Sequence, residues 1–161
     1  MKQLLIPPEV REECLDMAHQ DYERFHTASN TLVLTDSHEQ GIFRGLVGQW
    51  AVGQWLGVPW RLEPSNLAYD LISKTGKRVD VKTTGYGNPL MVPLRQEHKI
   101  DADRTDIFTL VWFSGRTDHV EICGWIEVSC FRCRMKRSLP SEGRFPIPTL
   151  FVPVEELREV K

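Results

Sequence analysis

Apolar residues recur at helical spacing near the start of the chain. Residues 8–26 carry such a series, made of Val10, Cys14, Met17, Ala18, Tyr22 and Phe25. Pro8 suits the first turn of a helix, because that position needs no backbone hydrogen-bond donor. We therefore expect an amphipathic helix over residues 8–26.

A second helix is expected over residues 37–56. Ser37 is a suitable N-cap with Gln40 three residues later, and Gly57 follows the last turn. Several glycines lower the intrinsic stability of this helix, so we expect it to approach the sheet or a substrate closely. Its predicted buried stripe consists of Ile42, Leu46, Gln49, Gly53 and Leu56.

The rest of the chain contains strand-like runs. Short strands are expected at residues 60–62, 67–73 and 78–84, followed by a helical turn at 96–102 and two longer strands at 107–113 and 120–128. The first of the longer strands is apolar on both faces, and the second alternates more. A basic loop at 130–137 and a late short strand at 149–152 complete the pattern.

The composition fits one domain. The chain has 161 residues, of which 41% are apolar, and this is enough for one hydrophobic core. The formal net charge of −2 does not point to a polyanionic partner, so function has to be sought in a local site. The first residues lack an apolar run as long as a signal sequence or a membrane span, and the four cysteines are expected to be reduced. We expect a cytoplasmic protein that does not enter a membrane.

The stretch YDLISKTGKRVDVKTT (residues 69–84) combines a hairpin with charged residues. If Gly76 ends a three-residue loop in the left-handed conformation, Asp70 lies directly across from Asp80. Residues two apart share a strand face, so Asp80 and Lys82 point the same way. Two facing carboxylates repel, so we expect Asp80→Asn to stabilise the metal-free fold. A Mg²⁺ or Mn²⁺ ion is the natural partner of such an acid pair.

These residues resemble the PD-(D/E)xK nuclease superfamily, which has the restriction-endonuclease-like fold. The resemblance covers about residues 37–128, with GLVGQWAVGQWLG in a helix, then YDLI, VDVKTT, DIFTLVWF and VEICGWIEV. It implies a single α/β domain over residues 1–161, with a central mixed sheet flanked by helices. Residues 8–26 would be a helix added to this core, and residues 129–161 a C-terminal extension. The implied activity is Mg²⁺-dependent hydrolysis of phosphodiester bonds in DNA.

The resemblance also assigns roles to residues. It implies that Asp70, Asp80 and the backbone carbonyl of Val81 ligate Mg²⁺ or Mn²⁺. Lys82 would position or deprotonate the attacking water and stabilise the negative charge that develops on the phosphate. These roles agree with general chemistry, because a bound metal lowers the pKa of its water and a nearby cation offsets developing charge.

Two positions depart from the family pattern. Tyr69 stands at the place of a proline, and Gln49 stands at the place of the glutamate of the helix. Gln49 offers only a neutral carbonyl oxygen, and we expect it to contact the metal or its waters. Glu39 is the less favoured alternative, about 15 Å away along the helix, because an acid in the first turn already suits the helix dipole.

Basic residues near these motifs are candidates for contacts with the nucleic-acid backbone, although any single one of them is more often a solvated surface residue. They are Lys74, Lys77, Arg78, Arg95, Lys99, Arg132 and Arg134.

Two other classes of function stay open. A catalytically inactive nucleic-acid-binding or assembly module with the same fold would explain Gln49. A zinc-stabilised interaction domain would use His119, Cys123, Cys130 and Cys133 as ligands. The sequence also leaves open the DNA substrate and the oligomeric state, for which a homodimer is one option.

Overall fold

The computed structural model describes residues 1–28, 36–60, 69–100, 104–143 and 147–160. Its centre is a mixed five-stranded sheet, which confirms the α/β class and the mixed strand directions. In spatial order the strands are β1 (Lys2–Leu5), β6 (His119–Glu127), β5 (Ile107–Trp112), β3 (Arg78–Thr84) and β2 (Leu71–Ile72). Strands β3 and β5 are parallel, and the other neighbours are antiparallel.

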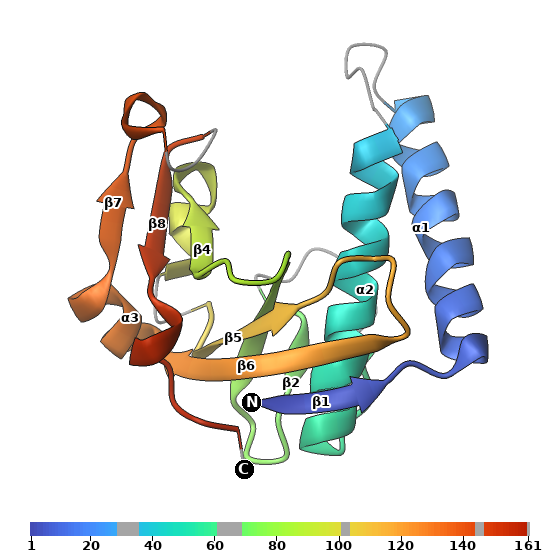
Figure 1. The fold of residues 1–161 in the computed structure, drawn as a ribbon, viewed down its shortest axis with the longest axis horizontal. Coiled ribbons are helices and arrows are strands. Elements are labelled where there is room, and N and C mark those ends of the chain that lie inside the picture. Colours follow the sequence, from blue (N-terminus) through green and yellow to red (C-terminus); the bar gives the residue numbers. More distant parts are fainter. Residues whose placement is uncertain (29–35, 61–68, 101–103, 144–146, 161) are drawn as a thin grey trace.

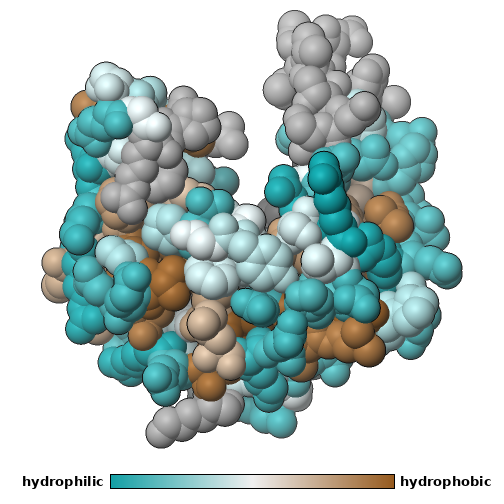
Figure 2. Space-filling view, viewed as in Figure 1, coloured by the Kyte–Doolittle hydropathy of each residue, from teal (hydrophilic) through white to brown (hydrophobic). Residues whose placement is uncertain are grey.

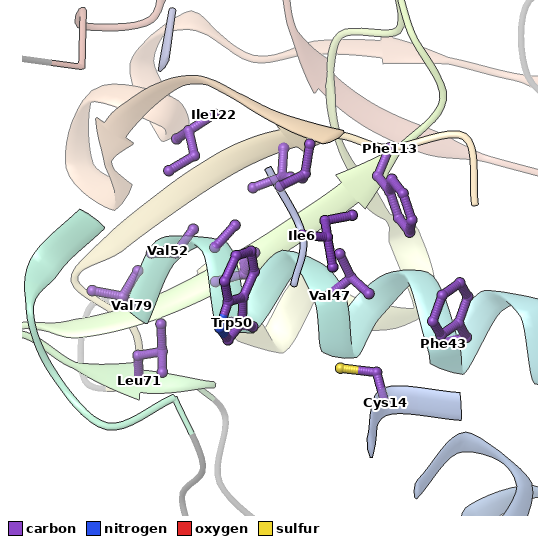
Figure 3. Close-up of a cluster of buried hydrophobic side chains, with 14 of the residues drawn as sticks. Ile6, Cys14, Phe43, Val47, Trp50, Val52, Leu71, Val79, Phe113 and Ile122 are labelled. Atoms are coloured by element: carbon purple, nitrogen blue, oxygen red, sulfur yellow. The ribbon is translucent and has the colours of Figure 1, made fainter. Parts of the chain in front are cut away.

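One face of this sheet is covered by helix α2 (Asp36–Leu56), and helix α1 (Pro8–Ala28) packs on the outside of α2 (Figure 1). Phe43, Val47 and Trp50 of α2 point towards the sheet, as Figure 3 shows. They meet Val79 and Phe113 in a core cluster that excludes water, so burial of apolar surface holds α2 on the sheet. Within the described residues, no helix is long and apolar enough to cross a membrane.

The other face carries a second core. It packs against a three-stranded antiparallel sheet of β4 (Leu90–Pro93), β8 (Thr149–Val152) and β7 (Lys136–Ser138), and against α3 (Val128–Arg134). Three short 3-10 turns, η1 (Leu94–Ile100), η2 (Pro140–Glu142) and η3 (Val154–Glu156), join these elements. The rings of Phe108 on β5 and Phe131 on α3 meet edge to face with centroids 5.1 Å apart. The helices therefore cover mainly one face, whereas the second sheet covers much of the other.

The two layers rise beyond the end of the central sheet and leave a notch between them. Figure 2 shows this notch in the space-filling view, with α1 and α2 on one side and β4, β7 and β8 on the other. Parallel strands β3 and β5 run towards it, so their carboxyl ends lie near its floor.

Several predicted elements are confirmed and others need correction. The strands at 78–84 and 149–152 have the expected bounds, but strands β1 and β4 were not expected. The predicted basic loop at 130–137 is wrong, because α3 and β7 occupy most of it. Of the strand predicted at 67–73, residues 67 and 68 lie outside the described residues, and Leu71–Ile72 form a strand in the rest. The strand predicted at 60–62 also falls mostly outside the described residues.

The predicted buried stripe of α2 is correct at Gly53, which is buried, but Ile42, Leu46, Gln49 and Leu56 are only half-buried. The fully buried positions include Val47 and Ala51, with Phe43 and Trp50 nearly so, rather than Leu46 and Gln49. The physical reason is that α2 packs on both the sheet and α1, so apolar residues occupy most of its circumference. Periodicity alone does not decide which of them faces the sheet.

Candidate functional site

The predicted hairpin between β2 and β3 is confirmed. Leu71 pairs with Val79, and Ile72 pairs with Arg78. Gly76 has a φ of +79°, a conformation that glycine adopts without steric cost, and its N–H donates to the carbonyl of Ser73. The turn therefore sets the register that brings Asp70 opposite the start of the VDVK motif.

The carboxylate of Asp70 is held against the backbone of β3. Its Oδ2 accepts a hydrogen bond of 2.7 Å from the N–H of Val81, and the Asp70 N–H donates to the carbonyl of Val79 at 2.8 Å. In a strand the N–H and C=O of one residue point to the same edge. Because β2 pairs with β3 only as far as Val79, the carbonyl of Val81 also faces the edge at which Asp70 lies.

Asp80 and Lys82 lie on the face of β3 opposite to α2, as their spacing predicted. Lys82 Nζ is 2.6 Å from Asp80 Oδ2, and the Asp80 side chain is fully buried. The Lys82 ammonium also donates to Oε1 of Gln96 on η1 at 3.1 Å and lies 6.0 Å from the ring centroid of Phe108. The positive charge of Lys82 thus compensates the negative charge of Asp80 in the metal-free protein. Asp80→Asn is therefore no longer expected to stabilise the metal-free fold by relieving a repulsion.

A cleft of about 310 Å³ opens beside Lys82. Residues 81–84 of β3 all line the cleft, although their side chains alternate between the two faces of the strand. This is expected because β2 pairs only with residues 78 and 79, which leaves the edge of β3 open beyond them. Its walls come from opposite sides of the notch, with Gly45 of α2 on one side and Met91, Pro93 and Gln96 on the other. Lys82 is 15% exposed and reaches the cleft, whereas Asp80 lies beneath it.

Helix α2 approaches β3 most closely at Gly48. A β-carbon at this position would overlap Oγ1 of Thr83, so only glycine permits this packing. This confirms the close approach to the sheet that the glycines predicted.

The two candidate acids of the helix differ in their surroundings. Gln49 is half-buried on the flank of α2, and within the described residues no hydrogen bond joins it to Asp70 or Asp80. Glu39 lies 3.2 Å from His19 of α1 and therefore faces away from the sheet. This contact supports a structural role for Glu39, while a role of Gln49 at a metal stays a prediction.

The residues around Asp70 have the right chemistry for a hard divalent cation. The Asp70 carboxylate accepts a hydrogen bond from the Val81 N–H, and the neighbouring residues Asp80 and Val81 of β3 supply a second carboxylate and a backbone carbonyl. Oxygen ligands of this kind suit Mg²⁺ and Mn²⁺. The described residues contain no group of three or more His, Cys, Asp or Glu side chains that could hold a metal. A site with two carboxylates is of a different kind, so this absence does not bear on it. Binding would require Lys82 to share or release Asp80.

For the zinc alternative, the described residues contain no cluster of His and Cys side chains that could serve as ligands. Burial of the Cys123 thiol raises its pKa to about 12, so it behaves as an apolar group rather than as a thiolate ligand. His119 lies 3.1 Å from the carboxylate of Asp118, and Cys130 and Cys133 lie on α3.

The predicted DNA-contacting residues occupy different places. Lys74 and Lys77 are exposed on the hairpin, at the end of the sheet away from the notch (Figure 1). Arg78 forms a two-pronged ion pair with Asp106, with both contacts at 3.0 Å. This hydrogen bonding lowers the pKa of Asp106 to about 2, so Arg78 ties the starts of β3 and β5 together.

The remaining basic residues lie elsewhere. Arg132 is exposed on α3, and Arg134 donates to the carbonyl of Glu156 at 3.1 Å. The side chains of Arg95 and Lys99 lie outside the described residues.

Gln96 is a site residue that the sequence did not reveal. It belongs to a predicted helical turn, but its contact with Lys82 joins residues 14 positions apart. Met91 and Pro93 of β4, which also line the cleft, had no recognisable signal because β4 itself was not predicted.

Comparisons of the chain with family models, with curated proteins and with solved structures gave no match.

Proposed function

We propose that this chain is a Mg²⁺-dependent nuclease that hydrolyses phosphodiester bonds in DNA. The observation that carries the proposal is the hydrogen bond from the Val81 N–H to Asp70, because it fixes the Asp70 carboxylate against the segment of β3 that carries Asp80, Val81 and Lys82. The cleft next to Lys82 gives a substrate a route to these groups. The resemblance of the YDLI and VDVK segments to the PD-(D/E)xK pattern supports the same reading.

In this proposal Asp70, Asp80 and the Val81 carbonyl hold Mg²⁺ or Mn²⁺. When bound, the ion would lower the pKa of a water ligand and polarise the scissile phosphate. Lys82 would orient the attacking water and offset the charge that develops on the phosphate. Its ammonium lies close to two oxygens, one from Asp80 and one from Gln96, and the contact with Gln96 would keep it in place when Asp80 turns to the metal.

The same features allow a second candidate, a nucleic-acid-binding or assembly module without catalysis. The short Lys82–Asp80 contact favours it, because a carboxylate already neutralised by a lysine has a weaker demand for a cation. Gln49 in place of the expected glutamate favours it as well.

A cleavage screen separates the two candidates. The purified protein would be incubated with plasmid, linear duplex, single-stranded and branched DNA, with Mg²⁺ or Mn²⁺ against EDTA. We expect metal-dependent cleavage that Lys82→Ala abolishes while Mn²⁺ binding, measured by calorimetry, persists. Asp70→Asn should abolish both, and Lys2→Ala on the opposite edge strand serves as a charge-matched control. DNA binding without any cleavage would favour the second candidate, and full activity of Lys82→Ala would reject the assigned site.

A further inference from the structure

Three arginines from distant parts of the chain line one pocket of about 210 Å³. Arg11 comes from α1, Arg44 from α2 and Arg116 from the loop between β5 and β6. Their convergence depends on the packing of α1 on α2, so the sequence alone did not indicate it. The other lining residues are Leu15, Gln40, Phe43, Ser114 and Gly115.

Arg11 is held in place at the base of this arginine pocket. Its two terminal nitrogens donate to the carbonyls of Gly115 and Thr117, both at 2.8 Å. The guanidinium lies 5.5 Å from the ring centroid of Phe43, which in turn meets Phe113 edge to face. A cation fixed by packing and hydrogen bonds loses little conformational entropy when it meets a ligand.

The charges of the pocket are unbalanced. None of the described residues that line it is acidic, and arginine stays protonated in proteins, so three positive groups line one space. Glu12, Glu39 and Asp118 are close in sequence to lining residues, but none of them is itself a lining residue. The exposed Asp118 carboxylate is bonded to His119, and its pKa is lowered by His119 and also by the charge of Arg11. Gln40 and Ser114 add neutral hydrogen-bonding groups. One guanidinium group can donate two parallel hydrogen bonds to two oxygens of a phosphate, so the pocket is suited to a phosphate.

The arginine pocket and the Lys82 cleft lie at the same end of the central sheet. Thr84, which lines the cleft, pairs with Trp112, and its carbonyl accepts a 2.9 Å hydrogen bond from Phe113. Ser114 follows directly, so its Cα is expected about 8 Å from that of Thr84, given the usual strand spacing and rise per residue. On α2 the neighbouring residues Arg44 and Gly45 line the arginine pocket and the cleft, respectively.

We propose that the arginine pocket binds a backbone phosphate of the DNA strand whose scissile bond lies at the Lys82 cleft. The inference rests on the proposed nuclease function. The anion is taken to be a DNA phosphate because the arginine pocket lies close to the cleft in which DNA would be cleaved. A span on the order of 10 Å corresponds to a few nucleotides, at about 3.4 Å per nucleotide of a duplex strand. Figure 2 shows hydrophilic residues beside the notch. The pocket would thus hold the strand in register with the Lys82 cleft.

Binding in EDTA tests the inference without requiring cleavage. The affinity of the whole protein for a fluorescent duplex and for a single strand would be measured between 50 and 200 mM salt. The double variant Arg44→Gln/Arg116→Gln removes two guanidinium groups, while Arg11 stays because it also fastens α1. Arg104→Gln is the control, since Arg104 is exposed at the amino end of β5. Inorganic phosphate, tested by thermal shift, serves as the free-anion probe.

We expect the double variant to bind DNA at least tenfold more weakly and to flatten the slope of log K against log salt by about one, as loss of one phosphate contact predicts. Equal affinity and slope for the double variant and Arg104→Gln would overturn the inference, even if the wild type cleaves DNA. Stabilisation by phosphate without binding of either DNA would also overturn it, because the pocket would then take a free anion. If the wild type binds DNA through these arginines but never cleaves it, the pocket stands and only the nuclease proposal fails.

Discussion

Lys82 Nζ lies 2.6 Å from Asp80 Oδ2, and this carboxylate is completely buried beneath the lysine. A buried charge loses much of its hydration, so each of the two groups depends on its partner. The pair that the sequence suggested as catalytic is therefore also part of the structural core. Experiments on these residues have to separate activity from stability.

The first prediction is that Lys82→Ala lowers the free energy of unfolding by about 3 kcal/mol at neutral pH, because it leaves the Asp80 charge without its cation. Asp80→Asn should destabilise by a smaller amount, since Lys82 reaches the cleft and can be hydrated there. Urea denaturation of both single variants and of the double variant Lys82→Ala/Asp80→Asn would measure the coupling. Strictly additive effects would show that the pair does not interact, and a more stable Asp80→Asn would restore the repulsion hypothesis.

The second prediction concerns acid. Because Arg78 lowers the pKa of Asp106 from 3.8 to about 2, the ion pair stabilises the fold fully above about pH 4 and loses this contribution as the pH falls towards 2. The Asp106 side chain is 26% exposed, so solvent screening reduces the gain to about 1–2 kcal/mol. Asp106→Asn should be less stable at pH 7, and the difference from the wild type should shrink by pH 2. An equal difference at both pH values, measured by urea denaturation, would contradict this account.

The third prediction compares two glycines of α2. Gly48→Ala should destabilise despite the helix propensity of alanine, because its β-carbon would overlap Thr83 on β3. Gly41→Ala, which meets no atom within 4 Å, should instead stabilise by up to about 1 kcal/mol. Thermal unfolding of the two variants measures the contrast. Stabilisation by both would mean that α2 does not approach β3 at this point.

The fourth prediction tests Gln49, the helix residue that the resemblance places at the proposed metal. Gln49→Glu should tighten Mn²⁺ binding, because a carboxylate on the flank of α2 adds charge near the open edge of β3. Gln54→Glu, on the exposed end of the same helix, adds the same charge as a control. Calorimetry should show tighter binding only for Gln49→Glu. Equal affinities of the two variants would remove Gln49 from the site.

Glu39→Gln should have no effect on metal affinity, since Glu39 contacts His19 on the outer helix. We expect a stability loss of at most about 0.5 kcal/mol, as for other exposed pairs. Loss of cleavage in a folded Glu39→Gln protein would make Glu39, rather than Gln49, the third acid.

The fifth prediction concerns the thiols. Cys14 and Cys123 are buried, and burial raises their pKa values to about 11 and about 12, so neither forms a thiolate at pH 8. Iodoacetamide should therefore modify exposed Cys133 first in the native protein and all four cysteines only after unfolding. Mass spectrometry counts the adducts. Protection of Cys133 by added zinc would revive the zinc-stabilised alternative.

The sequence by itself determined the features that depend on neighbours along the chain. The β2–β3 turn at Gly76, the shared face of Asp80 and Lys82 and the extent of β3 follow from local backbone preference and the two-residue period of a strand. Tertiary structure decided which side of α2 is buried, because α2 packs on both the sheet and α1 and carries apolar residues towards each of them. It also decided the contact of Lys82 with Gln96 and the meeting of Arg11, Arg44 and Arg116. These relationships join residues from separate elements, and only the packing of the whole chain brings them together.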